Sequence, residues 1–395
     1  MTSTSTRDPA RARLLLLCSV LFVAYLCVAI PLPIVPVFVT RQLGLSNAWA
    51  GLGVGIAFIS TVVSRGHSGA LADRRGPKVA VLRGLTFYIV GALISLLAGL
   101  LSHAHWLAFW VLLSGRLLLG IGESMVAVCI TAWGVNLLGP ARAGMALALV
   151  GAAMYGALAV GGPLGLALLN HAGFAGAMAV SALLCFVALL AIWRIPGIAP
   201  HPHAGRPSFW SVIGRIWLHG SVICCQGIGF AAIGAFFVLY FLHRDWAHAG
   251  LGLTAFGTGF VLVRVFFGHL PDRLGGLRVA TGSLIVEAIG QALIWSAHDP
   301  TVAFVGAFMT GLGCSMVFPA VGREVVHLVE PNLRATALGG FSAFQDLAYG
   351  LTGPLTGLLA DRAGYGSVFL IGSIAATVGV LICVYLRRAR GAASH

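Results

Sequence analysis

The sequence contains very little charge. Of its 395 residues only 9% are Asp, Glu, Lys or Arg, whereas 59% are apolar. Soluble domains carry about 25% charged residues, so this chain has too few to solvate a surface of its size. Acids are the scarcest group, with 11 Asp and Glu against 24 Lys and Arg. The composition therefore excludes an ordinary soluble protein.

Several functional motifs are also missing. The chain has no G-x-x-x-x-G-K-[S/T] phosphate loop, no H-E-x-x-H and no G-x-S-x-G, so neither an ATP-driven pump nor an intramembrane enzyme is supported. The eight cysteines lie in or beside apolar runs without the spacing of a metal site, which favours a packing role. We expect no enzymatic activity, no cofactor and no metal.

Long apolar runs occupy most of the chain. Runs of about 20 residues recur, each long enough to cross a hydrocarbon core, and they are continuous rather than alternating, which favours helices over a barrel. A cleaved signal peptide is disfavoured because the first run continues past Pro31 to Val39. We predict an all-α membrane protein with twelve transmembrane helices, at residues 14–39, 48–66, 80–101, 106–130, 144–169, 174–194, 212–241, 250–270, 278–297, 301–324, 335–359 and 366–387.

The basic residues predict the orientation. With both termini inside, 19 of the 24 Lys and Arg residues fall in or at inner segments, and the outer loops hold only Arg41, Arg244 and Arg362. This asymmetry predicts that both termini are cytoplasmic. The net charge of +13 then indicates contact with the lipids of an anionic leaflet, not with nucleic acid.

The chain repeats its own pattern. Residues 195–211 (IPGIAPHPHAGRPSFWS) predict a cytoplasmic linker between two six-helix halves, residues 1–194 and 212–395. Residues 162–174 (GPLGLALLNHAGF) match residues 353–365 (GPLTGLLADRAGY) at an offset of 191. Six-helix repeats are typical of transporters, which bind substrate at the repeat interface near the bilayer midplane.

A second repeat gathers much of the charge. Residues 69–84 (GALADRRGPKVAVLRG) follow the second span and contain the only lysine of the chain. This stretch resembles the loop motif G-x-L-a-D-r-x-G-r-k of the major facilitator superfamily. The matching residues are Gly69, Leu71, Asp73, Arg74, Gly76 and Lys78, with Pro77 in place of the usual basic residue. A shorter copy after the eighth span consists of Gly268, Asp272, Arg273 and Gly275.

The resemblance implies a fold and a gating role. It implies two pseudo-symmetric six-helix halves, with the first motif tying span 2 to span 11 when the protein opens outward and the second copy tying span 8 to span 5. The alternative is that the basic residues only set topology and contact lipid headgroups. The stretches 122–134, 152–165, 227–241 and 342–364 further resemble a bacterial branch of arabinose-efflux-like permeases.

Five charged residues fall well inside the predicted spans, away from their ends, and each costs at least about 2.5–3.5 kcal/mol near the bilayer centre. They are Arg116, Glu123, Arg264, Glu287 and Asp346. Because Arg116 and Glu123 are seven residues apart, each needs a partner on another helix or a place in the cavity. Asp346 is the predicted proton carrier, since a low dielectric favours its neutral form. The alternatives are a structural hydrogen bond from a donor such as Tyr155 or Gln226, and snorkelling for Arg264.

Uncharged residues complete the candidate set. Tyr25, Gln226, Gln345 and Tyr349 could orient a polar substrate, although such residues more often pack between helices. The Gly162-Pro163 and Gly353-Pro354 pairs could bend their helices or allow close packing.

These features predict a monomeric secondary transporter in the bacterial inner membrane. It would export a small polar or amphipathic molecule by alternating access, through proton antiport and with the proton gradient as its energy source. The export direction rests on the resemblance to the efflux branch and on Gly162-Pro163-x-Gly165, which resembles part of a drug–proton antiporter motif. The alternatives are a proton symporter that imports a metabolite, a uniporter, and a non-transporting sensor or partner protein.

Overall fold

Helices make up almost all of the described chain. The computed structural model describes residues 9–139, 142–198, 210–330 and 333–393, and it contains no strand within these ranges. The elements are α1 (Pro9–Ala29), α2 (Pro31–Val37), the π-helical turn η1 (Phe38–Gln42), α3 (Asn47–Arg75), α4 (Pro77–Leu100), α5 (His105–Leu138), α6 (Ala143–Arg194), α7 (Trp210–His243), α8 (Leu251–Phe267), α9 (Leu270–Leu274), α10 (Gly276–Trp295), α11 (Pro300–His327), α12 (Arg334–Ala363) and α13 (Gly366–Ala393).

The described helices account for the twelve predicted crossings. Nine segments are long and apolar enough to span a membrane, the first of which, Ala10–Gln42, joins α1, α2 and η1. The segment Met145–Arg194 contains two crossings, because the non-helical backbone of Gly173 divides α6 into two helices. α8 is a shorter apolar helix, and α12 adds one further crossing of 30 residues.

The predicted spans 48–66 and 80–101 leave the charged motif in a loop between them. This prediction is wrong, because the structure has only a one-residue turn there. A single residue, Gly76, separates α3 from α4. Its φ of 86° is a conformation that glycine adopts without strain. Gly69 and Asp73 therefore lie on α3 and Lys78 on α4, while Gly275, with a φ of 87°, separates α9 from α10 in the second copy.

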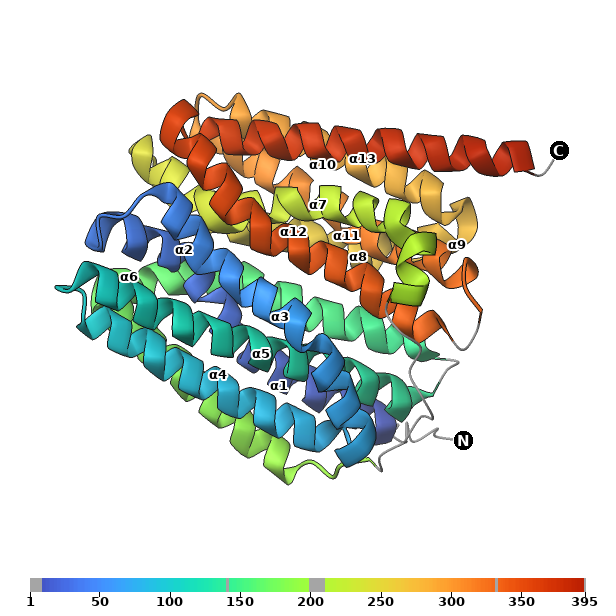
Figure 1. The fold of residues 1–395 in the computed structure, drawn as a ribbon, viewed down its shortest axis with the longest axis horizontal. Coiled ribbons are helices and arrows are strands. Elements are labelled where there is room, and N and C mark those ends of the chain that lie inside the picture. Colours follow the sequence, from blue (N-terminus) through green and yellow to red (C-terminus); the bar gives the residue numbers. More distant parts are fainter. Residues whose placement is uncertain (1–8, 140–141, 199–209, 331–332, 394–395) are drawn as a thin grey trace, which may run out of the picture.

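The helices form two groups that pack face to face, α1–α6 and α7–α13 (Figure 1). α3 packs along α12, and α6 packs along α8. α1 begins and α13 ends at the same end of the bundle (Figure 1), where α3 also ends with Arg74 and Arg75. We call this the basic end and the opposite end the far end.

Glycines hold α3 against α12 near the far end. A Cβ atom added to Gly51 would lie 2.1 Å from the carbonyl oxygen of Gly353. One added to Gly55 would lie 2.1 Å from the carbonyl oxygen of Gly350. Since side chains other than hydrogen do not fit at these separations, glycine is required for the contact between the two halves.

Polar contacts close the far end beyond these glycines. The Asp361 carboxylate accepts hydrogen bonds from the backbone N–H and from Nδ2 of Asn47, at 3.1 and 2.7 Å. The Tyr365 hydroxyl donates to Oδ1 of Asn47 at 3.0 Å. Asn47 begins the second span and Asp361 ends the eleventh, so these bonds link the first half to the second.

The α6–α8 crossing is built in the same way. A Cβ atom on Gly162 would lie 2.9 Å from the carbonyl oxygen of Gly250. The Thr254 hydroxyl donates a hydrogen bond of 2.7 Å to the Ala159 carbonyl. Gly162 and Gly353 therefore lie where helices of the two halves pack closely, and the adjacent Pro163 and Pro354 lie inside α6 and α12 without ending either helix.

The two halves separate toward the basic end. A Cβ atom added to Gly66 on α3 or to Gly339 on α12 would have no neighbouring atom within 4 Å. Figure 1 shows α3 and α12 diverging in this direction. The halves are thus in contact at the far end and apart near the basic end. The predicted linker, residues 195–211, lies mostly outside the described residues, so the domain boundaries stay a prediction.

Candidate functional site

An ion pair joins the two halves in the middle of the bundle. Nε of Arg65 on α3 donates to Oδ2 of Asp346 on α12 at 2.6 Å, and Nη2 of Arg65 contacts the same oxygen. The Arg65 side chain is 25% exposed and that of Asp346 is 9% exposed. Arg65 lies about 15 Å from the end of α3, at 1.5 Å per helical residue, so the pair is well inside the span. It bridges the halves where they begin to separate.

The structure corrects the predicted surroundings of Asp346. The proposed donors Tyr155 and Gln226 do not bond to its carboxylate, and its partner is Arg65, a residue near the end of the predicted span 48–66. A sequence signal for Arg65 did exist. It precedes Arg264 by 199 residues, which is also the spacing between the two charged motifs.

Glu123 on α5 lies beside this pair. Its side chain is buried, and Oε1 accepts a hydrogen bond of 3.0 Å from the hydroxyl of Tyr25 on α1. The charged groups that act on it electrostatically are Asp346, Arg65 and Arg116. Glu123 therefore lies within electrostatic range of a second carboxylate and of two guanidinium groups, of which Arg116 is buried and Arg65 is partly exposed.

Arg116 is held within the first half and is 1% exposed. Its Nε donates to the carbonyl of Gly53 at 3.1 Å, while Nη1 and Nη2 are buried without a hydrogen-bond partner in the described part of the chain. The spacing argument is confirmed, because Arg116 and Glu123 each bond to another helix. Since the guanidinium is enclosed, Arg116 is a poor candidate for contact with a substrate in this conformation.

The second half contains Glu287 on α10, a buried acid that forms no ion pair among the described residues. Its side chain is 0% exposed, and neither carboxylate oxygen has an N–H or O–H donor among the described residues. The weak S–H donor of Cys314 lies beside it, and a Cβ atom on Gly229 would come within 2.4 Å of Oε1. An ionised carboxylate is strongly destabilised in such surroundings.

The uncharged candidates meet in the same central region. Nε2 of Gln345 donates to Oε1 of Gln226 at 2.9 Å, which links α12 to α7. Tyr349 packs between two rings, with centroid distances of 5.2 Å to Phe58 and 4.7 Å to Phe230. These contacts join helices, as expected for packing residues.

Arg264 on α8 is also inside the bundle. Its Nη2 donates to the carbonyl of Ser315 at 2.8 Å, and the guanidinium lies over the Phe260 ring at 5.1 Å. Nε is buried without a hydrogen-bond partner among the described residues. Arg264 therefore points into the protein, and the snorkelling alternative does not describe its position.

The second charged motif makes its described ion pair within its own half. The carboxylate of Asp272 on α9 lies 3.6 Å from Nε of Arg323 on α11. In the first motif, Nζ of Lys78 donates to the carbonyl of Trp193 at 2.8 Å, again within one half. Ties from these motifs to the opposite half stay a prediction for a conformation closed at the basic end.

Comparison with known proteins shows which family this chain belongs to. The family model described as Major Facilitator Superfamily matches residues 17–247 and 220–395. The chain belongs to the major facilitator superfamily. An uncharacterised transporter of this superfamily from Salmonella typhimurium is 43% identical over 369 residues, covering 93% of this chain and 95% of that protein. One from Burkholderia mallei is 40% identical over 375 residues, covering 93% and 91%.

Solved structures of superfamily transporters share the fold. The human organic anion transporter MFSD10 superposes with a TM-score of 0.70 at 16% identity, covering 95% of this chain and 100% of that one. The nucleoside transporter NupG gives a TM-score of 0.75 at 14% identity, covering 95% and 99%. The chain is a multi-pass membrane protein of the superfamily, and its curated relatives are named as transporters, not enzymes.

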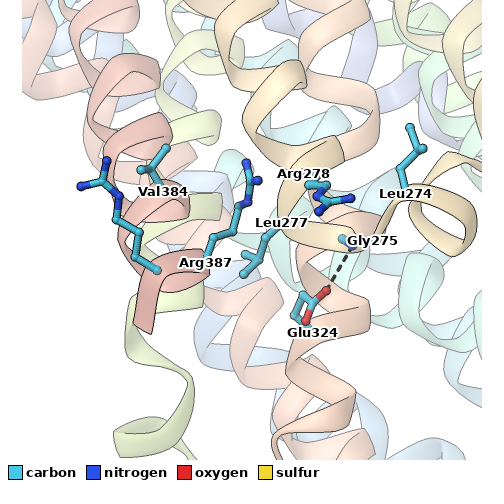
Figure 2. Close-up of a pocket in the computed structure, with 9 residues that line it drawn as sticks. Leu274, Gly275, Leu277, Arg278, Glu324, Val384 and Arg387 are labelled. Atoms are coloured by element: carbon cyan, nitrogen blue, oxygen red, sulfur yellow. Dashed lines mark hydrogen bonds between the residues drawn. The ribbon is translucent and has the colours of Figure 1, made fainter. Parts of the chain in front are cut away.

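The transporter also has a basic pocket away from the ion pair. About 450 Å³ in volume, it lies at the basic end and is lined by Arg278, Arg387 and Arg388. Figure 2 shows the Glu324 carboxylate at its base, where it accepts a 3.1 Å hydrogen bond from the backbone N–H of Gly276. The three arginines are exposed, and exposed cations at the cytoplasmic end of a span attract anionic lipid headgroups.

Proposed function

We propose that this protein is a secondary active transporter that exports a small polar or amphipathic molecule in exchange for protons. The observation that carries the proposal is the Arg65–Asp346 ion pair between the halves. Because Asp346 can take up a proton, this ion pair couples the charge of its carboxylate to the relative position of the two halves. The proposed moving bodies are residues 1–194 and 212–395, joined by residues 195–211.

The proposed cycle uses the proton to break this bond. In the described conformation Asp346 is ionised, Arg65 holds it, and the halves are apart at the basic end. Substrate enters there, the halves rock, and substrate leaves at the far end. Protonation of Asp346 from the far side then removes its charge, which weakens the pair and lowers the cost of the return step. Release of the proton toward the basic end restores the pair.

Two alternatives use the same residues. In a symporter the proton and the substrate would cross together, and Glu123 beside Asp346 would serve import equally well. In a uniporter Asp346 and Glu123 would only bind substrate. Export is preferred because of the resemblance to the efflux-like branch and to part of the antiporter motif at Gly162-Pro163.

Proton flux through liposomes tests the proposal. Purified protein is reconstituted with an internal pH dye, and gradients of sugars, amino acids, organic acids and cationic drugs are imposed. We expect one class to drive a pH change, with protons moving opposite to the substrate. Asp346→Asn should reduce this change by about 100-fold or more, because its amide cannot carry a proton.

Asp299→Asn provides the matched control. Asp299 is an exposed acid that caps α11, and asparagine caps helices equally well, so the control should keep normal flux. Protons moving with the substrate would replace antiport by symport. Substrate movement without any pH change would contradict proton coupling and leave Asp346 as a binding or structural residue.

The proposed orientation has its own test. We propose that the basic end faces the cytoplasm of a bacterial cell, because the basic residues concentrate there. A fluorescent protein fused after the last residue should therefore fluoresce. Alkaline phosphatase inserted after Ala247, in the α7–α8 connection at the far end, should be active. The reverse pattern would contradict this orientation and the direction of transport derived from it.

A further inference from the structure

The two crossings between the halves are copies of each other. In sequence, 199 residues separate Gly51 from Gly250, and 191 residues separate Pro163 from Pro354. In the structure, a Cβ atom on Gly51 would lie 2.7 Å from the Pro354 nitrogen, and one on Gly250 would lie 3.3 Å from the Pro163 nitrogen. The same packing contact therefore occurs twice, and these two offsets relate equivalent positions.

This register assigns a counterpart to each member of the central ion pair. Arg65 corresponds to Arg264 at the offset of 199, and Asp346 corresponds to Tyr155 at the offset of 191. Arg264 and Tyr155 also act on each other electrostatically, and both lie against Phe260. The equivalent site thus keeps its cation but has a phenol where the other site has a carboxylate.

The guanidinium of Arg264 consequently lacks a counter-ion. None of the carboxylates in the described residues forms an ion pair with it. One nitrogen, Nη2, donates to a main-chain carbonyl, that of Ser315, and Nε is buried without an acceptor. A Cβ atom added to Gly151 on α6 would lie 3.8 Å from Nη1 of Arg264. A partly buried cation whose Nε has no acceptor among the described residues is unfavourable unless an anion joins it.

The Phe260 ring under this cation belongs to an aromatic cluster. The rings of Tyr155 and Phe260 are stacked, with centroids 3.4 Å apart. Phe256 lies 5.3 Å from Phe230, which in turn lies 4.7 Å from Tyr349 of α12. This cluster extends from α6 and α8 across to α7 and α12, so aromatic rings from both halves lie close to a single positive charge.

We propose that Arg264 binds the carboxylate of an amphipathic organic anion, whose apolar body packs on the aromatic rings beside Phe260. The substrate carboxylate takes the place beside Arg264 that Asp346 takes beside Arg65. The guanidinium presents two parallel N–H donors to carboxylate oxygens, a geometry that lysine cannot reproduce. This inference rests on the proposed transport function, because it names the substrate class of that central region.

Binding of simple carboxylates tests the inference. The probes are octanoate and benzoate, compared with octanol, benzylamine and glucose, and binding to the purified protein is measured by ligand-induced thermal stabilisation. We expect the carboxylates alone to stabilise the wild type in a concentration-dependent way. Arg264→Gln should weaken this binding by about 10- to 100-fold, as expected for a hydrogen bond to a charged group. Arg264→Lys should lie between the two.

A charge placed at the equivalent position gives a sharper test. Tyr155→Asp supplies the counter-ion that the other site already has, so it should compete with the ligand and weaken carboxylate binding by a similar factor. Because the new acid pairs with Arg264, this variant should remain folded. Arg215→Gln removes an exposed arginine at the start of α7 and should bind as the wild type does.

The outcomes separate this inference from the proposed function. Carboxylate binding that is absent in the wild type, or unchanged in both Arg264→Gln and Tyr155→Asp, would overturn the assignment of Arg264. If another compound class then drives Asp346-dependent proton flux, the transport proposal survives alone. If carboxylates bind through Arg264 but none moves protons or crosses the membrane, the site stands and the proposed function fails.

Discussion

Gly51→Ala is expected to abolish transport by opening the far end. Its Cβ would lie 2.1 Å from the Gly353 carbonyl oxygen. This clash can be relieved only if the backbones of α3 and α12 move apart. Overpacking of this kind costs about 1–3 kcal/mol, which corresponds to a roughly 5- to 150-fold shift between two conformations. The cost falls only on the conformation in which α3 and α12 touch. The population should therefore move toward a form that is open at the far end.

Distances between the halves measure this shift. Spin labels at Ala104→Cys and Ala363→Cys report on exposed positions of the first and second halves at the far end. We expect a longer distance in Gly51→Ala and an unchanged one in Gly282→Ala. Gly282 lies on α10, is exposed, and has no atom within 4 Å of an added Cβ. An unchanged distance distribution in Gly51→Ala would show that these glycines do not control the far end.

Arg65→Gln is expected to destabilise the protein and stop its cycle. Removing one partner of a buried pair leaves the other charge uncompensated, which costs about 3–5 kcal/mol. We expect the lower end of this range, because the Arg65 side chain is 25% exposed. The melting temperature in detergent should fall by several degrees. The remaining Asp346 charge should also favour conformations that give it access to water.

The double variant Arg65→Gln with Asp346→Asn separates pairing from charge. With both charges gone, no buried ion is left alone, so the melting temperature should recover most of the loss seen in Arg65→Gln. Transport coupled to protons should stay absent, because the titratable group is missing. If the losses of the two single variants simply add in the double variant, the two residues act independently and the ion pair is not the link between the halves.

The sequence predicted much of the architecture because the relevant signals are local. The length and continuity of the apolar runs gave twelve crossings, and the helices α1 to α13 supply them. The family motif around Asp73 pointed to the superfamily that the comparisons show. The same motif was predicted as a loop, although it is a turn at Gly76. Spacing alone does not reveal that two helices continue to within one residue of each other.

The candidate site was predicted in part. Glu123, Glu287 and Asp346 were identified because a carboxylate inside an apolar run is costly wherever it lies. Their surroundings could not be predicted in this way. Glu123 receives a hydrogen bond from Tyr25, 98 residues away, whereas Glu287 receives none from an N–H or O–H group of the described residues. Nothing in the two local sequences distinguishes these environments.

The sequence alone determined that this protein crosses the membrane as helices, that its halves repeat, and which family it resembles. These properties follow from composition and spacing, which act over one helix or one repeat. Tertiary structure decided that Arg65 pairs with Asp346 across 281 residues, while the equivalent Arg264 lies over the Phe260 ring that stacks on Tyr155. It also decided which glycines bring the halves together. Both depend on how helices from different halves cross, and a crossing fixes contacts that no single segment encodes.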